Sequence, residues 1–113
     1  MPKQGDILLV PIPFTDLSSQ KRRPVIVISN NAYNQKANDL VVVAMTSNPV
    51  AVDYSFTITS SELDVGSLNH PGKVRTDKIY TISNSIVVKT FGRVKDIVLE
   101  RIRTELQALF AKK

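Results

Sequence analysis

Three short segments of the chain place cations, hydroxyl groups and one carboxylate beside apolar stretches. They are residues 21–29, 43–47 and 73–78, with the sequences KRRPVIVIS, VAMTS and KVRTDK. Arginine and lysine attract phosphate oxygens, a hydroxyl can donate a hydrogen bond to them, and a carboxylate can accept a proton. Cleavage of a phosphodiester needs these groups when no metal ion takes part. The segments therefore predict a site for phosphodiester chemistry, provided that the fold brings them together.

Each segment coincides with a predicted β-strand or with the end of one, so a sheet must position the site. Residues 24–29 and 40–45 are apolar on both faces, which is typical of central strands. Residues 54–59 alternate apolar and polar side chains, which is typical of a strand nearer an edge. The predicted strands are residues 7–10, 24–29, 40–45, 54–59, 73–82 and 86–94.

The segments between these strands carry turn residues, and the chain ends in a predicted helix. Residues 30–39 are expected to form a loop or a single helical turn, residues 60–63 a helical turn and residues 64–72 a connecting loop. The last segment has apolar residues at helical spacing, with Asp96 as the expected N-cap. The apolar positions are Val98, Ile102, Leu106, Leu109 and Phe110. Six short strands and one terminal helix predict a mainly β fold, a small and strongly bent barrel with a C-terminal α-helix.

Composition places limits on the kind of protein. A chain of 113 residues is long enough for one domain with its own core, and we expect residues 1–113 to form a single domain. Fifteen Lys and Arg against ten Asp and Glu give a net charge of +5, which favours a polyanionic partner. The absence of cysteine excludes disulfides and thiolate metal sites. The N-terminus lacks the apolar region of a signal peptide, and no apolar run approaches the roughly 20 residues of a membrane span. We therefore expect a cytoplasmic protein with no membrane association.

Taken in order along the chain, these segments resemble the PemK/MazF toxins of bacterial toxin–antitoxin systems. The matching elements are residues 5–7, 10–16, 22–29, 44–47 and 74–79. The resemblance implies an SH3-like barrel of the type shared with CcdB gyrase poisons, a homodimer, and sequence-selective cleavage of single-stranded RNA without a metal or other cofactor. The implied products are a 2′,3′-cyclic phosphate and a 5′-hydroxyl. The implied partner is a cognate antitoxin whose acidic, disordered segment lies across a basic groove.

The resemblance also implies catalytic roles for four residues. Arg23 matches the catalytic arginine that precedes a proline, and Thr46 matches the threonine or serine that hydrogen-bonds the scissile phosphate. Arg75 and Asp77 match the Arg-x-Asp of the PemK branch, where the carboxylate is proposed as the base and the arginine as acid or stabiliser. Arginine has a very high pKa, so charge stabilisation is the preferred role for both arginines. A surface ion pair is the alternative for Arg75 and Asp77, and the identity of the general base stays open.

Further residues near these motifs are expected to contact RNA. They are Phe14, Thr15, Lys21, Arg22, Ser47 and Lys78. Phe14 could stack on a base, but a core or dimer-facing position is an equal alternative. The first loop, residues 15–21, is more compact than the glycine-rich loop of the MazF branch, so the cleaved sequence does not transfer. His70 lies in a predicted exposed loop that no family motif reaches, and we expect it to be a spectator.

Two other classes of function remain open from the sequence. The same barrel could be a non-catalytic toxin or binding module, either gyrase-directed like CcdB or a degenerate RNA binder. Residues 111–113 lack the aromatic terminus of CcdB-like proteins, which favours the ribonuclease. An SH3-like peptide adaptor would need an exposed aromatic groove, and the chain has no Trp, four Phe and three Tyr.

Overall fold

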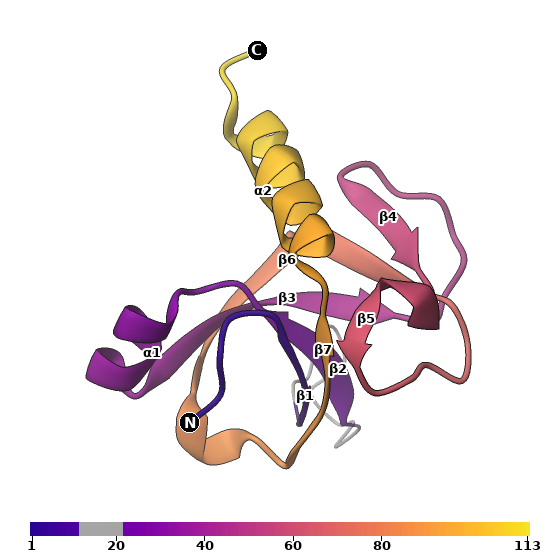
Figure 1. Ribbon diagram of the computed structural model, residues 1–113. Helices are drawn as coiled ribbons and strands as arrows, with labels where there is room; N and C mark the ends of the chain where they lie inside the picture. The colour runs from indigo at the N-terminus through magenta and orange to yellow at the C-terminus, as the bar shows by residue number, and fades with distance from the viewer. Residues whose placement is uncertain (12–21) are drawn as a thin grey trace.

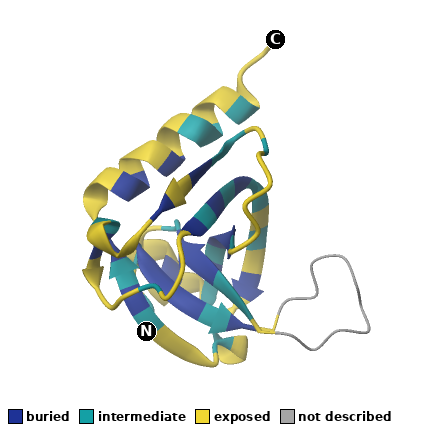
Figure 2. Cartoon of the chain, turned by 90° about the vertical axis from the view of Figure 1, so that its right-hand side faces the viewer, coloured by how far each residue is buried: buried dark blue, intermediate teal, exposed yellow. Residues whose placement is uncertain are grey.

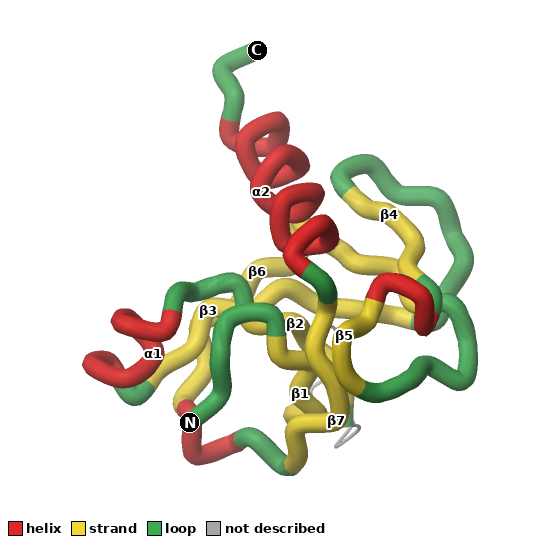
Figure 3. The backbone as a smooth tube through the Cα atoms, in the orientation of Figure 1, coloured by secondary structure: helices red, strands yellow, loops and turns green. Residues whose placement is uncertain are grey.

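One curled sheet of seven antiparallel strands dominates the described part of the chain, and a long helix packs on one of its faces (Figures 1 and 3). The structure, a computed structural model, describes residues 1–11 and 22–113. The strands are β1 (Asp6–Val10), β2 (Arg23–Val27), β3 (Asp39–Thr46), β4 (Ser55–Ile58), β5 (Leu63–Val65), β6 (Gly72–Ser83) and β7 (Lys89–Val94), and the α-helices are α1 (Asn31–Ala37) and α2 (Asp96–Phe110). In the sheet the strands follow the order β4-β6-β3-β2-β1-β7-β5. The mainly β architecture with a C-terminal helix is the predicted one.

Both faces of the sheet carry hydrophobic side chains, because neighbouring residues of a strand point to opposite faces. In β2, Ile26 belongs to one buried cluster, whereas Val25 and Val27 belong to the other. The first cluster includes Val98 and Ile102 of α2, so the helix covers that face. The second cluster packs on the opposite face, mainly from β1, β2 and β3. Figure 2 shows the resulting band of buried residues through the sheet.

The predicted positions of three strands are confirmed. β2 and β3 lie inside the sheet, and β4 is an edge strand. In β4, Phe56 and Ile58 are buried while Thr57 is exposed, which is the expected alternation. β5 was not predicted: its first residue, Leu63, was expected in a helical turn and its other two residues in a connecting loop. With three residues it is too short to show a periodic pattern, and its pairing with β7 defines it as a strand.

Two further segments differ from their predicted structure. The sixth strand, expected from residue 86, begins at Lys89, and a 3₁₀ turn, Asn84–Ile86, precedes it. The 30–39 segment contains a helix of seven residues, α1. The Asn30 side chain caps this helix by accepting a hydrogen bond from the Tyr33 N–H at 2.8 Å.

Helix α2 confirms the predicted apolar face in its first half. Val98 and Ile102 are almost fully buried, whereas Phe110 is 72% exposed because the last turn extends past the sheet (Figure 1). The predicted N-cap was wrong. Lys95 occupies that position, and Asp96 is the first helical residue, where its negative charge still interacts favourably with the helix N-terminus.

Candidate active site

Three adjacent strands bring the predicted cations and hydroxyl to one face of the sheet. β3 lies between β2 and β6, with Ala44 opposite both Val25 and Arg75. Residues that pair across strands share a face, and so do residues two apart along a strand. Arg23 is two residues from Val25, and Thr46 is two residues from Ala44. Arg23, Thr46 and Arg75 therefore share a face by register alone.

These side chains surround a cavity of about 330 Å³. Among its lining residues are four cations, the Thr46 hydroxyl and the Asn48 amide, while apolar side chains form the rest of the wall. The lining residues are Arg23, Ala44, Met45, Thr46, Asn48, Val50, Val52, Lys73, Arg75 and Lys78. A cavity of this charge favours an anion, and a phosphate group fits its guanidinium groups well.

An irregularity in β6 shapes the edge of this cavity. Val43 pairs with Ile79, but the next residue, Ala44, pairs with Arg75. Residues 76–78 are thus extra on β6, and they form a bulge of three residues. Thr76 is fully buried, and both its N–H and its hydroxyl donate to the Tyr54 carbonyl oxygen. The bulge leaves Lys78 at the cavity.

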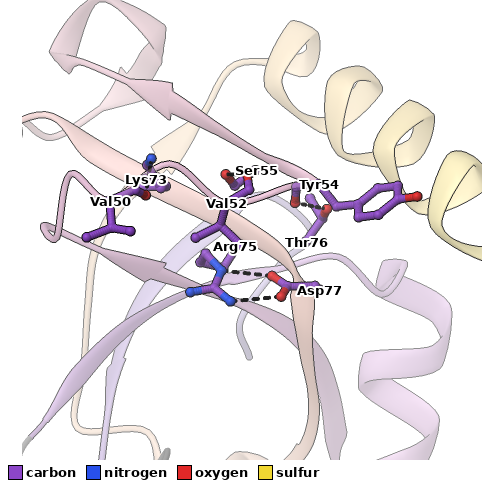
Figure 4. A network of polar contacts seen from close by, with 8 residues as sticks. All are labelled: Val50, Val52, Tyr54, Ser55, Lys73, Arg75, Thr76 and Asp77. Atoms are coloured by element: carbon purple, nitrogen blue, oxygen red, sulfur yellow. Dashed lines mark hydrogen bonds and ion pairs between the residues drawn. The ribbon is translucent and has the colours of Figure 1, made fainter.

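Arg75 and Asp77 form a two-fold hydrogen-bonded ion pair (Figure 4). Arg75 Nε donates to Asp77 Oδ1 at 2.8 Å, and Arg75 Nη2 donates to Asp77 Oδ2 at 2.8 Å. The hydrogen bonds from Arg75 lower the pKa of Asp77, and the same bonds raise the pKa of Arg75. Burial raises the pKa of Tyr80 on the same strand. At neutral pH, Asp77 is ionised and Arg75 is held in one orientation.

The Thr46 hydroxyl is prepared to donate a hydrogen bond. Its oxygen accepts the Asn48 N–H at 3.1 Å. A hydroxyl has two acceptor lone pairs and one hydrogen, so this contact leaves the hydrogen for another acceptor. In a cationic cavity, the expected acceptor is a phosphate oxygen.

The structure brings together most of the predicted catalytic residues. Arg23, Thr46 and Arg75 line the cavity, and Asp77 is bound to Arg75. The ion pair between Arg75 and Asp77, which the sequence left as an alternative to their catalytic roles, is present, and it joins Arg75 to a residue of the bulge.

The predicted RNA-contacting residues divide into three groups. Lys78 lines the cavity. Ser47 lines a neighbouring hollow of about 380 Å³, which shares Asn48 and Lys73 with the site. Arg22 is exposed and is not one of the described residues that line the cavity. Three others lie outside the described residues: Phe14, Thr15 and Lys21.

Sequence reasoning missed one wall of the cavity and the position of His70. Asn48, Val50 and Val52 belong to the loop between β3 and β4, and the Asn-Pro pair predicted that loop without showing which face it covers. His70 is exposed as expected, but it lines the neighbouring hollow. Its predicted role as a spectator remains a prediction.

Within residues 1–11 and 22–113, no three His, Asp or Glu residues gather as a metal site would require. No helix in the same residues has the length and apolar character to cross a membrane.

Comparison with known proteins identifies the family. The chain is similar to an endoribonuclease from a mycobacterial species, solved in complex with its cognate antitoxin, with a TM-score of 0.75 and 19% identity over 100% of both chains. It is also similar to MazF in a MazE–MazF complex from Deinococcus radiodurans, with a TM-score of 0.78 and 20% identity over 99% of this chain and 98% of the other. A third similar structure is the Mycobacterium tuberculosis toxin MazF-mt6, with a TM-score of 0.74 and 16% identity over 93% and 95% of the two chains.

At sequence identities of 16–20%, the similarity to these structures shows a shared fold and no more. No curated protein matches the chain in sequence. Residues 3–110, however, match the model of the PemK-like, MazF-like toxin of type II toxin–antitoxin systems. The chain belongs to this toxin family.

Proposed function

We propose that this protein is an endoribonuclease toxin that cuts single-stranded RNA without a metal ion. The ribose 2′-oxygen attacks the adjacent phosphorus, the bond from phosphorus to the 5′-oxygen breaks, and the products are a 2′,3′-cyclic phosphate and a 5′-hydroxyl. One observation carries this proposal: Arg23, Thr46 and Arg75 surround one cavity, with Asp77 bonded to Arg75.

The cations supply the electrostatic part of the reaction. Negative charge grows on the phosphate oxygens in the transition state, and fixed donors directed at those oxygens lower the barrier. Arg23 and Arg75 carry permanent charges on planar groups that suit phosphate oxygens. Thr46 adds a neutral donor. Because these groups stand on adjacent strands of a rigid sheet, little reorganisation is needed when the substrate binds.

Asp77 is the proposed proton acceptor for the 2′-hydroxyl. Its lowered pKa keeps it ionised at neutral pH, which a base requires, although a low pKa also makes it a weak base. Arg75 acts by charge and does not donate a proton, because Asp77 raises its already high pKa. The leaving 5′-oxygen then takes its proton from water.

A protein antitoxin is the proposed partner. Similar toxins have been solved with a cognate antitoxin or with MazE. The net charge of +5 and the four cations at the cavity favour an acidic antitoxin segment that competes with RNA. We also propose that the toxin is a homodimer, as the family resemblance implies.

The test is cleavage of a long single-stranded RNA in excess EDTA by purified protein free of antitoxin. Arg23→Gln is compared with Arg22→Gln, which removes the same charge from the adjacent, exposed position. We expect discrete cuts bearing cyclic phosphate, a fall of about 100-fold or more for Arg23→Gln, and a change of only several-fold for Arg22→Gln.

Two outcomes would contradict the proposal. Intact RNA with folded wild-type protein would favour a binding or gyrase-directed role. Equal losses in the two arginine variants would mean that Arg23 acts only through its contribution to net charge.

A further inference from the structure

The loop between β3 and β4, residues 47–54, forms one wall of the cavity and is fastened to β6 by a lysine. Asn48, Val50 and Val52 of this loop line the cavity. Lys73 Nζ donates to the Val50 carbonyl oxygen at 2.6 Å and approaches the Pro49 carbonyl oxygen at 3.4 Å. Lysine at a phosphate site is expected to act as a point charge, but this ammonium group is directed to backbone carbonyls.

The first half of the loop has its own internal contacts. The Asn48 N–H donates to Thr46 Oγ1 at 3.1 Å, and the Val50 N–H donates to Asn48 Oδ1 at 3.1 Å. With the Lys73 contact, both the N–H and the C=O of Val50 are hydrogen-bonded. Val50 is 60% exposed, and the backbone of such an exposed loop residue is usually less constrained by hydrogen bonds within the protein.

The second half is fixed as well (Figure 4). The Ser55 hydroxyl donates to the Val52 carbonyl oxygen, and Thr76 donates twice to that of Tyr54. Tyr54 has a φ of +59°, a conformation that a non-glycine residue adopts only when its surroundings enforce it. The loop is therefore built as a fixed wall.

We propose that Lys73 is a positioning residue that holds Val50 and Val52 in place, so that this aliphatic wall selects the nucleobase beside the scissile phosphate. The inference rests on the proposed ribonuclease function. The cavity has a cationic side for phosphate and an aliphatic side on which the flat face of a base can pack. A base held there is discriminated by its shape and by the contacts of its edges with the loop.

Lys78 offers a matched control, because it is a second lysine of β6 that lines the same cavity. The variants are Lys73→Met, Lys73→Arg and Lys78→Met. Hydrogen exchange of the Asn48 and Val50 amides is measured first, without RNA. We expect about tenfold faster exchange in Lys73→Met, since losing one such hydrogen bond changes the opening equilibrium by about that factor. Lys78→Met should leave these amides unchanged, and Lys73→Arg should restore most of the protection.

Cleavage of an RNA library with randomised positions around the cut is measured second. Lys73→Met should relax the preference at one position next to the cut, and Lys73→Arg should restore it. Lys78→Met should weaken cleavage of all sequences alike. Val52→Thr, which changes the polarity of the wall at constant shape, should alter the preference at the same position as Lys73→Met.

The two measurements separate the two proposals. Unchanged amide exchange in Lys73→Met would overturn the role of Lys73 in holding the loop. Faster exchange with an unchanged cleavage preference would overturn the role of the wall in selecting a base. Failure of the wild type to cut any RNA would instead overturn the ribonuclease proposal, and the exchange result would still report on the loop.

Discussion

The guanidinium of Arg75 and the carboxylate of Asp77 meet edge to edge, through two hydrogen bonds of 2.8 Å each. Such a fork aligns the planes of the two groups. Both side chains are about one quarter exposed, so solvent screens the pair only in part. The pair fixes the orientation of the Arg75 guanidinium, so its remaining N–H groups are held in one direction at the edge of the cavity.

Replacing Asp77 should impair catalysis much more than folding. In Asp77→Asn the charge is lost and an amide N–H group faces the guanidinium, so Arg75 is no longer held by two bonds. We expect kcat to fall by about 100-fold or more, while the free energy of unfolding falls by about 1–2 kcal/mol. Single-turnover cleavage and urea unfolding measure the two quantities. A variant with near-normal kcat would reduce the pair to a surface contact.

The pH dependence follows from the direction of the Asp77 shift. Its pKa in the folded protein is lowered by Arg75, so the stabilisation from this group is present above its unfolded pKa, near 3.9, and is lost as the pH falls through the lower folded pKa. Asp77 is then ionised throughout the neutral range. We expect kcat/KM to show no acid limb from this group between about pH 5 and 8. Cleavage rates across this range test the point.

His70→Gln is the control for that pH profile. If the wild type loses activity on the acid side of neutrality, and the variant has a much lower rate at all pH values without that acid limb, the base role would move from Asp77 to the histidine of the neighbouring hollow.

The Thr46 hydroxyl should matter as a hydrogen-bond donor. Thr46→Val keeps the shape of the side chain and removes the hydroxyl, so we expect kcat to fall by about 100-fold. Thr46→Ser keeps both the donor and the acceptor for the Asn48 N–H, and should remain within several-fold of wild type. Near-normal activity in Thr46→Val with a large loss in Thr46→Ser would indicate that the site needs the methyl group and not the hydroxyl.

Two glycines allow backbone strain to be separated from steric collision. Gly5 and Gly66 have φ angles of +93° and +86°. A Cβ at Gly5 would lie 3.4 Å from Leu99 Cδ1, which is an acceptable contact, whereas at Gly66 it would lie 2.4 Å from the Phe91 carbonyl oxygen. We expect Gly5→Ala to lower the free energy of unfolding by about 1–2 kcal/mol, and Gly66→Ala by about 1–3 kcal/mol more. Urea unfolding of both variants gives the comparison, and equal losses would rule out the collision.

Much of the site could be predicted because it depends on local pattern. The apolar run after Arg23 and the run before Thr46 are typical of buried strands, and strand ends are where a sheet presents functional side chains. The two-residue spacing of Arg75 and Asp77 was enough to hold an ion pair between them as one alternative.

The rest depends on contacts that no local pattern encodes. Within the bulge in β6, Thr76 donates to the Tyr54 carbonyl oxygen, 22 residues away in sequence. The wall formed by Val50 and Val52 depends in the same way on Lys73, whose side chain reaches back across 23 residues. Alternation and turn residues carry no information about such pairings, so the loop could be predicted but not the face that it covers.

The bulge of residues 76–78 also bears on how such a toxin can diversify. Pairing resumes on both sides of it, at Arg75 and at Ile79, and its odd length reverses which face the strand presents. Thr76 and Asp77 are held by Tyr54 and Arg75, but Lys78 faces the cavity without such a role among the described residues. A change at Lys78 would alter the cavity wall while the flanking register stays the same.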